Sequence, residues 1–186
     1  MRRKEKKPAV FLAVFIAAIM VTSVIGYIIA DNTTQQKKYK GIKFETDSVS
    51  WFAVIDGTRY SFSFLPQDVE YIETPKMDYT GIVQLYVTSS PNSTSSGQIA
   101  ESIFELSQTL SQKGIYALQG FIVENEYSLP VFTCSNATQF VPVIYYADGN
   151  STGIRKEGNC IIIESDNSYS FLPYTDALIY RFLGLT

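Results

Sequence analysis

A stretch of 22 residues without a single charge, residues 9–30, constrains this chain more than any other feature. As an α-helix rising about 1.5 Å per residue it would span about 33 Å, enough for the hydrocarbon core of a bilayer. Residues 1–8 precede it with five basic side chains and one acidic side chain. Because positively charged flanks stay in the cytoplasm, this pattern predicts a cytoplasmic stub (1–8), a transmembrane helix (9–30) and an external C-terminal portion.

Two other kinds of N-terminal segment share this layout. A secretory signal peptide has an apolar part of about 7–15 residues and small residues before its cleavage site. Here the apolar run is longer, and Ile28 stands three residues before any cut after Ala30, so an uncleaved signal anchor is favoured. A pilin also begins with a long apolar helix, but Pro8 precedes this run and no Glu lies within it.

Small residues recur every fourth position along the apolar run and therefore share one helix face. Such a face lets two helices approach closely in lipid, so it predicts a helix-mediated dimer in addition to contact with the lipid bilayer through residues 9–30. The simpler interpretation is a single helix in lipid, since small residues are common in such helices. The residues concerned are Ala18, Thr22, Gly26 and Ala30.

The charge beyond the apolar run is acidic. From Asp31 onward the chain has 10 Lys and Arg against 17 Asp and Glu, a net charge of −7. Such a surface repels phosphate backbones, so nucleic acid is not expected as a partner. Residues 31–42 are polar and predict a tether, and residues 43–186 are long enough for one folded extracytoplasmic domain with a core of its own.

Cysteines and glycosylation sequons support an external location. Cys134 and Cys160 are the only cysteines, and an even pair beyond a membrane anchor predicts a disulfide. Four Asn-x-Ser/Thr sequons occur where chance would give about one, which predicts N-glycosylation on exposed turns. Asn32 lies too close to the membrane for a transferase, which leaves Asn92, Asn136 and Asn150 as the expected sites.

The pattern of apolar residues predicts an α/β or α+β domain with one small mixed sheet. Asp56-Gly57 between two aromatic and β-branched runs indicates a hairpin. A strand over 81–89, a helix starting near Ser96 and ending before Gly114, and a strand over 115–124 together predict a parallel βαβ unit. Short strands are expected at 131–134, 143–147 and 159–164, and a final helix over 170–183.

The residues that carry common chemistries are sparse. The chain has no His, which excludes Ser-His and Cys-His nucleophile pairs and makes a zinc site with two cysteines incomplete. No catalytic residue, metal site or cofactor is therefore assigned. Paired carboxylates, as used in glycoside hydrolysis, occur as Glu124 with Glu126 and Glu164 with Asp166. Residues 148–153 resemble the start of a calcium loop, but a hairpin turn explains the same residues.

The last third of the chain resembles a group of short, uncharacterised archaeal membrane-anchored proteins. The resemblance covers residues 130–186 and rests on a few short motifs. It implies an archaeal surface location and a fold with paired cysteines, and it implies no catalytic residue. The motifs are Cys134-Ser-Asn-Ala-Thr138, Pro142-Val-Ile144, Glu157-Gly-Asn-Cys-Ile-Ile-Ile-Glu164, Asp176-Ala-Leu-Ile-Tyr180 and the terminal Leu-Gly-Leu.

Taken together, the sequence predicts a single-pass protein of the cell membrane whose C-terminal domain lies outside. Its expected role is that of an envelope accessory or interaction module that binds an envelope protein, because anchoring raises the effective concentration of a weak binding surface. The alternative is an envelope enzyme such as a carbohydrate hydrolase that uses paired carboxylates.

Overall fold

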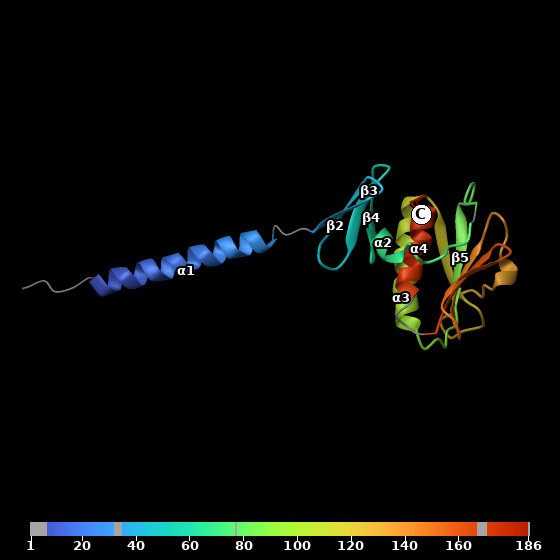
Figure 1. Ribbon diagram of the computed structural model, residues 1–186. Coiled ribbons are helices and arrows are strands. Elements are labelled where there is room, and N and C mark those ends of the chain that lie inside the picture. The colour runs from blue at the N-terminus through green and yellow to red at the C-terminus, as the bar shows by residue number, and fades with distance from the viewer. Residues whose placement is uncertain (1–6, 32–34, 77, 167–170, 186) are drawn as a thin grey trace, which may run out of the picture. The chain divides into compact units, whose positions relative to one another are not determined.

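The computed structural model describes residues 7–31, 35–76, 78–166 and 171–185. The chain divides into two compact units, residues 1–35 and 36–186, and each is described by itself (Figure 1). Over the described residues the fold is mixed α/β with four α-helices, in agreement with the α/β class expected from the sequence. The expectation of one mixed sheet is wrong, because the strands form two separate sheets, of four and of five strands.

The first unit contains the long helix α1 (Lys7–Asp31). Its side chains are described over residues 11–25, and every one of them is exposed. Thr22 donates its hydroxyl hydrogen to the carbonyl oxygen of Ala18, at 2.9 Å, so this polar group is satisfied within the helix. Among the described residues no helix is long and apolar enough to cross a membrane, so the expected transmembrane span over residues 9–30 is not supported there.

The second unit begins with an antiparallel sheet whose strands follow chain order. Its strands are β1 (Gln36–Tyr39), β2 (Ile42–Thr46), β3 (Trp51–Ile55) and β4 (Thr58–Phe62). The β3–β4 hairpin turns at Asp56-Gly57, as expected, and both turn residues have positive φ, 51° and 80°. Such backbone angles match the twist of a two-residue hairpin and favour Asp-Gly.

Residues 36–42, expected as part of the polar tether, instead form β1, a tight turn and the start of β2. Lys40 and Gly41 have φ of 44° and 89°, which makes a second turn of the same kind. Three of the four residues of β1 are exposed. A strand at a sheet edge with mostly solvent-facing side chains shows no apolar alternation, which is why its sequence resembles a linker.

The larger sheet has five strands in the order β6-β5-β7-β9-β8. The first four are parallel, and β8 pairs antiparallel with β9. The expected βαβ unit is confirmed: β5 and β6 are parallel neighbours joined by a helix. The strands are β5 (Gln84–Ser89), β6 (Tyr116–Phe121), β7 (Val143–Asp148), β8 (Gly153–Glu157) and β9 (Cys160–Ser165).

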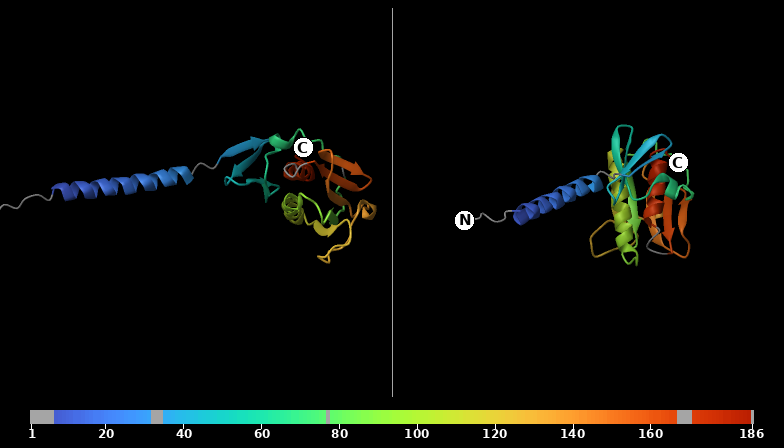
Figure 2. Two further views of the ribbon diagram at one scale, coloured as in Figure 1. Left: turned by 90° about the horizontal axis from the view of Figure 1, so that it is seen from below. Right: turned by 60° about the vertical axis from the view of Figure 1, so that its left-hand side comes forward.

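Two helices fill the space between the sheets. Figure 2 shows α3 (Ser96–Gln112) and α4 (Phe171–Phe182) side by side, with the smaller sheet on one side and the larger sheet on the other. A short helix, α2 (Pro66–Val69), follows the smaller sheet and contacts α4. The apolar stripe of α3 at Ile99, Ile103, Leu106 and Leu110 is buried, as its 3.6-residue period predicts.

The larger sheet is covered on both faces, but by different kinds of structure. Leu85, Val87 and Ile144 belong to the main core with α3 and α4. Val143 and Ile162 belong to a smaller cluster on the opposite face. The 3₁₀-helix η1 (Cys134–Asn136) and the loop residues around it cover this second face, where a strand over 131–134 had been expected. Only Val131 makes a strand-like bridge there, to Phe121.

Candidate functional site

A groove lies beside the outer edge of β6, near the carboxyl ends of the parallel strands. Its volume is about 390 Å³, and it runs between one side of α3, strand β6 and the loop that follows β6. Ligands of open α/β sheets bind at this end of the strands, because the connecting loops open there. The lining residues carry no formal charge: Ser89, Ser90, Pro91, Ser96, Ile99, Ala100, Ile103, Gln119, Gly120, Phe121, Tyr127 and Leu129.

The loop that forms one wall of the groove is organised by the side chain of Asn125. Its amide nitrogen donates to the carbonyl oxygen of Leu129 at 2.9 Å. Its amide oxygen accepts the backbone N–H groups of Tyr127 and Leu129, at 3.1 and 3.2 Å. Asn favours such local bonds to its own loop, so the groove wall is largely preformed. The ring of Tyr127 also packs 5.8 Å from that of Phe121.

A smaller hollow of about 220 Å³ adjoins the groove and shares Pro91 and Tyr127 with it. It contains the first of the carboxylate pairs singled out in the sequence, since both Glu124 and Glu126 line it. Both residues are exposed, and Asn92 lies in the same wall. The structure thus brings this pair to one shallow, polar surface site.

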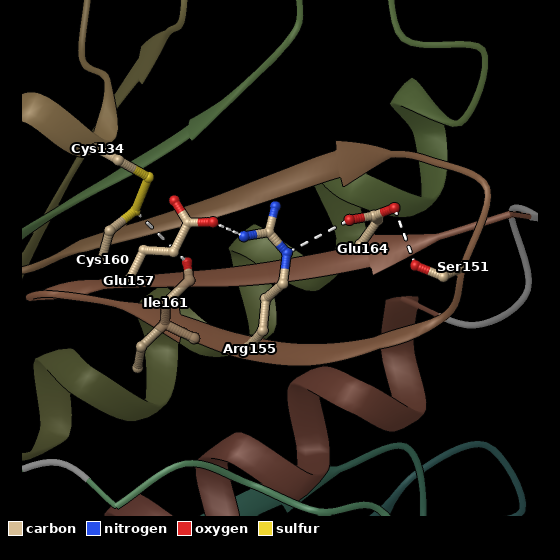
Figure 3. A network of polar contacts seen from close by, with 7 residues as sticks. All are labelled: Cys134, Ser151, Arg155, Glu157, Cys160, Ile161 and Glu164. Atoms are coloured by element: carbon tan, nitrogen blue, oxygen red, sulfur yellow. Dashed lines mark hydrogen bonds and ion pairs between the residues drawn. A yellow bond between two sulfur atoms is a disulfide. The ribbon is translucent and has the colours of Figure 1, made fainter.

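The second pair, Glu164 and Asp166, lies in a different place, and each residue has partners of its own. Figure 3 shows those of Glu164. One Glu164 oxygen accepts a hydrogen bond from the Ser151 hydroxyl at 3.1 Å, and the other lies 3.5 Å from Nε of Arg155. Asp166 accepts a hydrogen bond from the Thr152 hydroxyl. These carboxylates tie β9 to the β7–β8 connection. The hairpin turn expected over residues 148–153 is wrong, because β7 and β8 each pair with β9 and not with each other, so these residues form a connection that passes β9.

Cys134 and Cys160 lie together as a disulfide, as expected from the sequence (Figure 3). Their Cα atoms are 5.2 Å apart, within the range for such bonds. The bond joins η1 to the first residue of β9, whose side chain is fully buried. It therefore attaches the loop over the second sheet face directly to the sheet.

The three expected glycosylation sites are all exposed, but their surroundings differ. Asn92 and Asn150 lie in loops at the carboxyl end of the sheet, and the loop with Asn92 is joined to the last residue of β7 where Thr94 N–H donates to Asp148 at 3.2 Å. Asn136 lies in η1, where its side-chain oxygen accepts the backbone N–H of Thr133 at 2.8 Å. Asn32 lies outside the described residues. The structure leaves the use of all three sequons as a prediction.

The structure also brings together two carboxyl groups that the sequence analysis did not pair. Glu105 of α3 and Asp176 of α4 are 9% and 0% exposed and form a carboxyl pair between the two helices. Ser63 donates its hydroxyl to Glu105 at 3.2 Å, and the Phe64 N–H donates to Asp176 at 2.6 Å. Because α3 and α4 are far apart in the sequence, only the packing of the helices could reveal the pair.

Burial governs the protonation of this pair. It raises the pKa of Glu105 to about 7, partly offset by the hydrogen bond from Ser63. Burial also raises the pKa of Asp176 well above its ordinary value, and the neighbouring Glu105 charge adds to that effect. The two raised pKa values mean that the pair carries at least one proton at neutral pH. Neither residue lines the groove or the hollow described above.

No protein-family model, curated protein or solved structure matches this chain. The geometry of the described residues offers an uncharged groove beside a strand edge, an exposed acidic hollow next to it, and a buried carboxyl pair away from both.

Proposed function

We propose that this protein is anchored in the cell membrane by residues 9–30, with residues 1–8 in the cytoplasm and the α/β domain outside. Supporting this, the uncharged run lies within one continuous helix, α1, and its described side chains, residues 11–25, are apolar or small and exposed all round. A helix that is apolar on every face requires apolar surroundings. Lateral pairing of this helix through its small residues stays a prediction.

We further propose that the external domain is an interaction module that binds an envelope protein through the groove beside β6. The observation that carries this proposal is the groove itself, which is uncharged and lies against a strand edge with exposed apolar side chains. Exposed apolar surface on a domain with a net negative charge is typical of binding sites. Anchoring would let a weak contact suffice, because both partners share one membrane surface.

Site-specific photo-crosslinking in native membranes tests this proposal. A photoreactive residue replaces Gln119, which lines the groove, or Val54, which is 62% exposed on the smaller sheet. We expect a discrete crosslinked species from position 119 and none from position 54. Equal crosslinking from both positions, or none from position 119, would contradict an interaction through the groove.

The second candidate is an envelope carbohydrate hydrolase, because the structure does bring Glu124 and Glu126 to one hollow. Glycoside hydrolysis needs one carboxyl group as acid and another as base or nucleophile. The test is release of reducing sugar from envelope polysaccharide by the full chain, compared with Glu124→Gln and Glu126→Gln variants. Activity that either variant abolishes would favour the hydrolase.

A surface location also gives the sequons a proposed use. We propose that Asn92, Asn136 and Asn150 carry glycans in a host that glycosylates external proteins. The resemblance of residues 130–186 to archaeal membrane-anchored proteins agrees with such a host. Mass spectrometry of glycopeptides from the purified chain distinguishes the three sites.

A further inference from the structure

The backbone of β6 presents unused hydrogen-bonding groups along its outer edge. The N–H groups of Tyr116 and Ile122 point inward, toward β5. They donate to the carbonyl oxygens of Val83, at 2.8 Å, and of Ser89, at 3.0 Å. Because successive residues of a strand point their backbone groups to opposite sides, Ala117 and Gln119 face outward. Among the described residues no strand pairs with β6 at these two positions.

The two edges of the larger sheet differ sharply in charge. Strand β8, at the other edge, carries Arg155, Lys156 and Glu157. Such charges protect an edge from pairing with another chain. Strand β6 carries no charge, and its Tyr116 and Leu118 side chains are 78% and 44% exposed. The unprotected edge is thus the one that adjoins the groove.

The chain itself shows that this edge accepts a further strand. At its far end, Phe121 donates its N–H to Pro130 at 3.0 Å and accepts the N–H of Phe132 at 2.9 Å. This short segment pairs in parallel with β6 and stops there. The edge before it, at Ala117 and Gln119, is left for a segment from elsewhere, with the groove beside it to receive alternate side chains.

We propose that the outer edge of β6 binds an extended, uncharged segment of a partner protein by strand addition, with its alternate apolar side chains in the groove. The N–H and C=O groups of Ala117 and Gln119 would form up to four hydrogen bonds to it. Main-chain bonds supply affinity in this mode of recognition, and the pockets beside the strand supply specificity. This inference rests on the proposed interaction function and names the form that the partner takes.

A second copy of the chain fits this edge less well than an extended segment does. If two β6 strands paired about a twofold axis at Leu118, Ile115 of the second copy would come opposite Phe121. That place is already taken by Val131. Ile115 is itself buried in its own core, and its N–H already donates to the carbonyl oxygen of Leu110 at 2.9 Å.

Hydrogen–deuterium exchange of the full chain in lipid nanodiscs tests the proposal. The probes are acetylated and amidated pentapeptides with Val, Ile, Phe or Tyr at the second and fourth positions and Thr elsewhere. A matched peptide has Lys at the second and fourth positions. We expect an uncharged peptide to slow exchange of two amides in the fragment that spans β6 at least tenfold, and the Lys peptide to leave them unchanged.

A Gln119→Pro variant removes one outward N–H from this edge strand, a position where Pro is tolerated. We expect it to weaken peptide binding at least tenfold and to protect at most one amide. Should this variant fail to fold, Leu118→Asp keeps both N–H groups and places a charge on the edge, with the same expected loss. Val54→Asp, on the smaller sheet, is the matched control and should bind as the parent chain does.

Two results would overturn strand addition. One is the absence of β6 protection with every peptide, and the other is protection that appears without peptide and grows with protein concentration, which would indicate self-association. Crosslinking from position 119 in membranes combined with no β6 protection would leave the interaction module standing and reject only this form of binding.

Discussion

The buried pair of Glu105 and Asp176 makes the stability of the α/β domain depend on pH. The pKa of Glu105 lies at about 7 in the folded chain, against an ordinary value of 4.5. The folded state therefore keeps its proton in a range where the unfolded chain has lost it. The stabilisation that protonated Glu105 gives the folded state is fully present below pH 4.5. It is lost as the pH rises to about 7, because in that range the unfolded chain binds fewer protons than the folded chain does.

The size of this effect follows from the shift. A difference of about 2.5 pH units, at about 1.36 kcal/mol per unit, corresponds to roughly 3 kcal/mol lost between pH 4.5 and pH 7. The pKa of Asp176 is raised as well, so its contribution has the same sign. Such a loss is a large part of the stability of an ordinary domain, which is about 5–15 kcal/mol.

Urea unfolding of the full chain in detergent micelles measures the effect. Trp51, the only tryptophan, lies in the smaller sheet next to the main core and reports unfolding by fluorescence. We expect the free energy of unfolding to fall from pH 4.5 to pH 7. Above pH 7 Glu105 should add no further pH dependence, because it is then ionised in both the folded and the unfolded state. A Glu105→Gln variant should lose the share of this slope that belongs to Glu105, roughly 3 kcal/mol between pH 4.5 and pH 7, because its amide does not titrate, and should keep the share that belongs to Asp176.

Glu101→Gln is the matched control. Glu101 lies on the same helix, is exposed, and is the smallest of the influences on the pKa of Glu105. This variant should therefore keep the pH dependence of the parent chain. Equal stability of the parent at pH 4.5 and pH 7, or an unchanged slope in Glu105→Gln, would refute the reasoning.

Three further predictions concern the disulfide, a glycine of β6 and one sequon. A Cys134→Ser variant should lose about 3.5 kcal/mol of unfolding free energy, since the disulfide closes a loop of 26 residues; equal urea midpoints for the two chains would contradict this. A Gly120→Ala variant should lose about 1–3 kcal/mol, because a Cβ there would overlap the carbonyl oxygen of Pro130 and come 2.6 Å from the Phe132 ring; calorimetry of both chains measures it. An Asn92→Gln variant should lower the mass of the chain from a glycosylating host by one glycan without changing its melting temperature.

The elements with strong local patterns were predictable from the sequence. The stripe on α3, the Asp56-Gly57 turn and the β5–α3–β6 unit each follow from periodicity or turn chemistry over a few residues. The sequence could also pair the cysteines, because a chain with only two leaves a single intramolecular pairing.

Elements without an apolar period could not be predicted in this way. Strand β8 is missing from the sequence-based expectation. It lies at a sheet edge, and its charged residues do not alternate with buried apolar ones, so it shows no strand pattern. The connection from β6 to β7 has no helical pattern, so its path over the second sheet face could not be foreseen.

The candidate site was less predictable than the fold. Glu124 and Glu126 were singled out as strand-end carboxylates, and they do share a hollow. The groove beside them depends on which strand forms the sheet edge, and strand order is a long-range property. Glu105 lies in the helical pattern of α3, but its burial depends on α4, which joins the fold from the other end of the chain.

Because of the disulfide, the structures that cover the two faces of the larger sheet differ in their sensitivity to reducing agents. One face is covered by helices held by noncovalent contacts, apolar packing and hydrogen bonds, whereas the other is covered by a loop that a covalent bond fastens to β9. A thiol reductant should therefore open the two faces in sequence, with the loop freed first and the helices retained. Formation of this disulfide would then be the step that fixes the loop on the second face, and exposure of that face would report whether a chain has formed the bond.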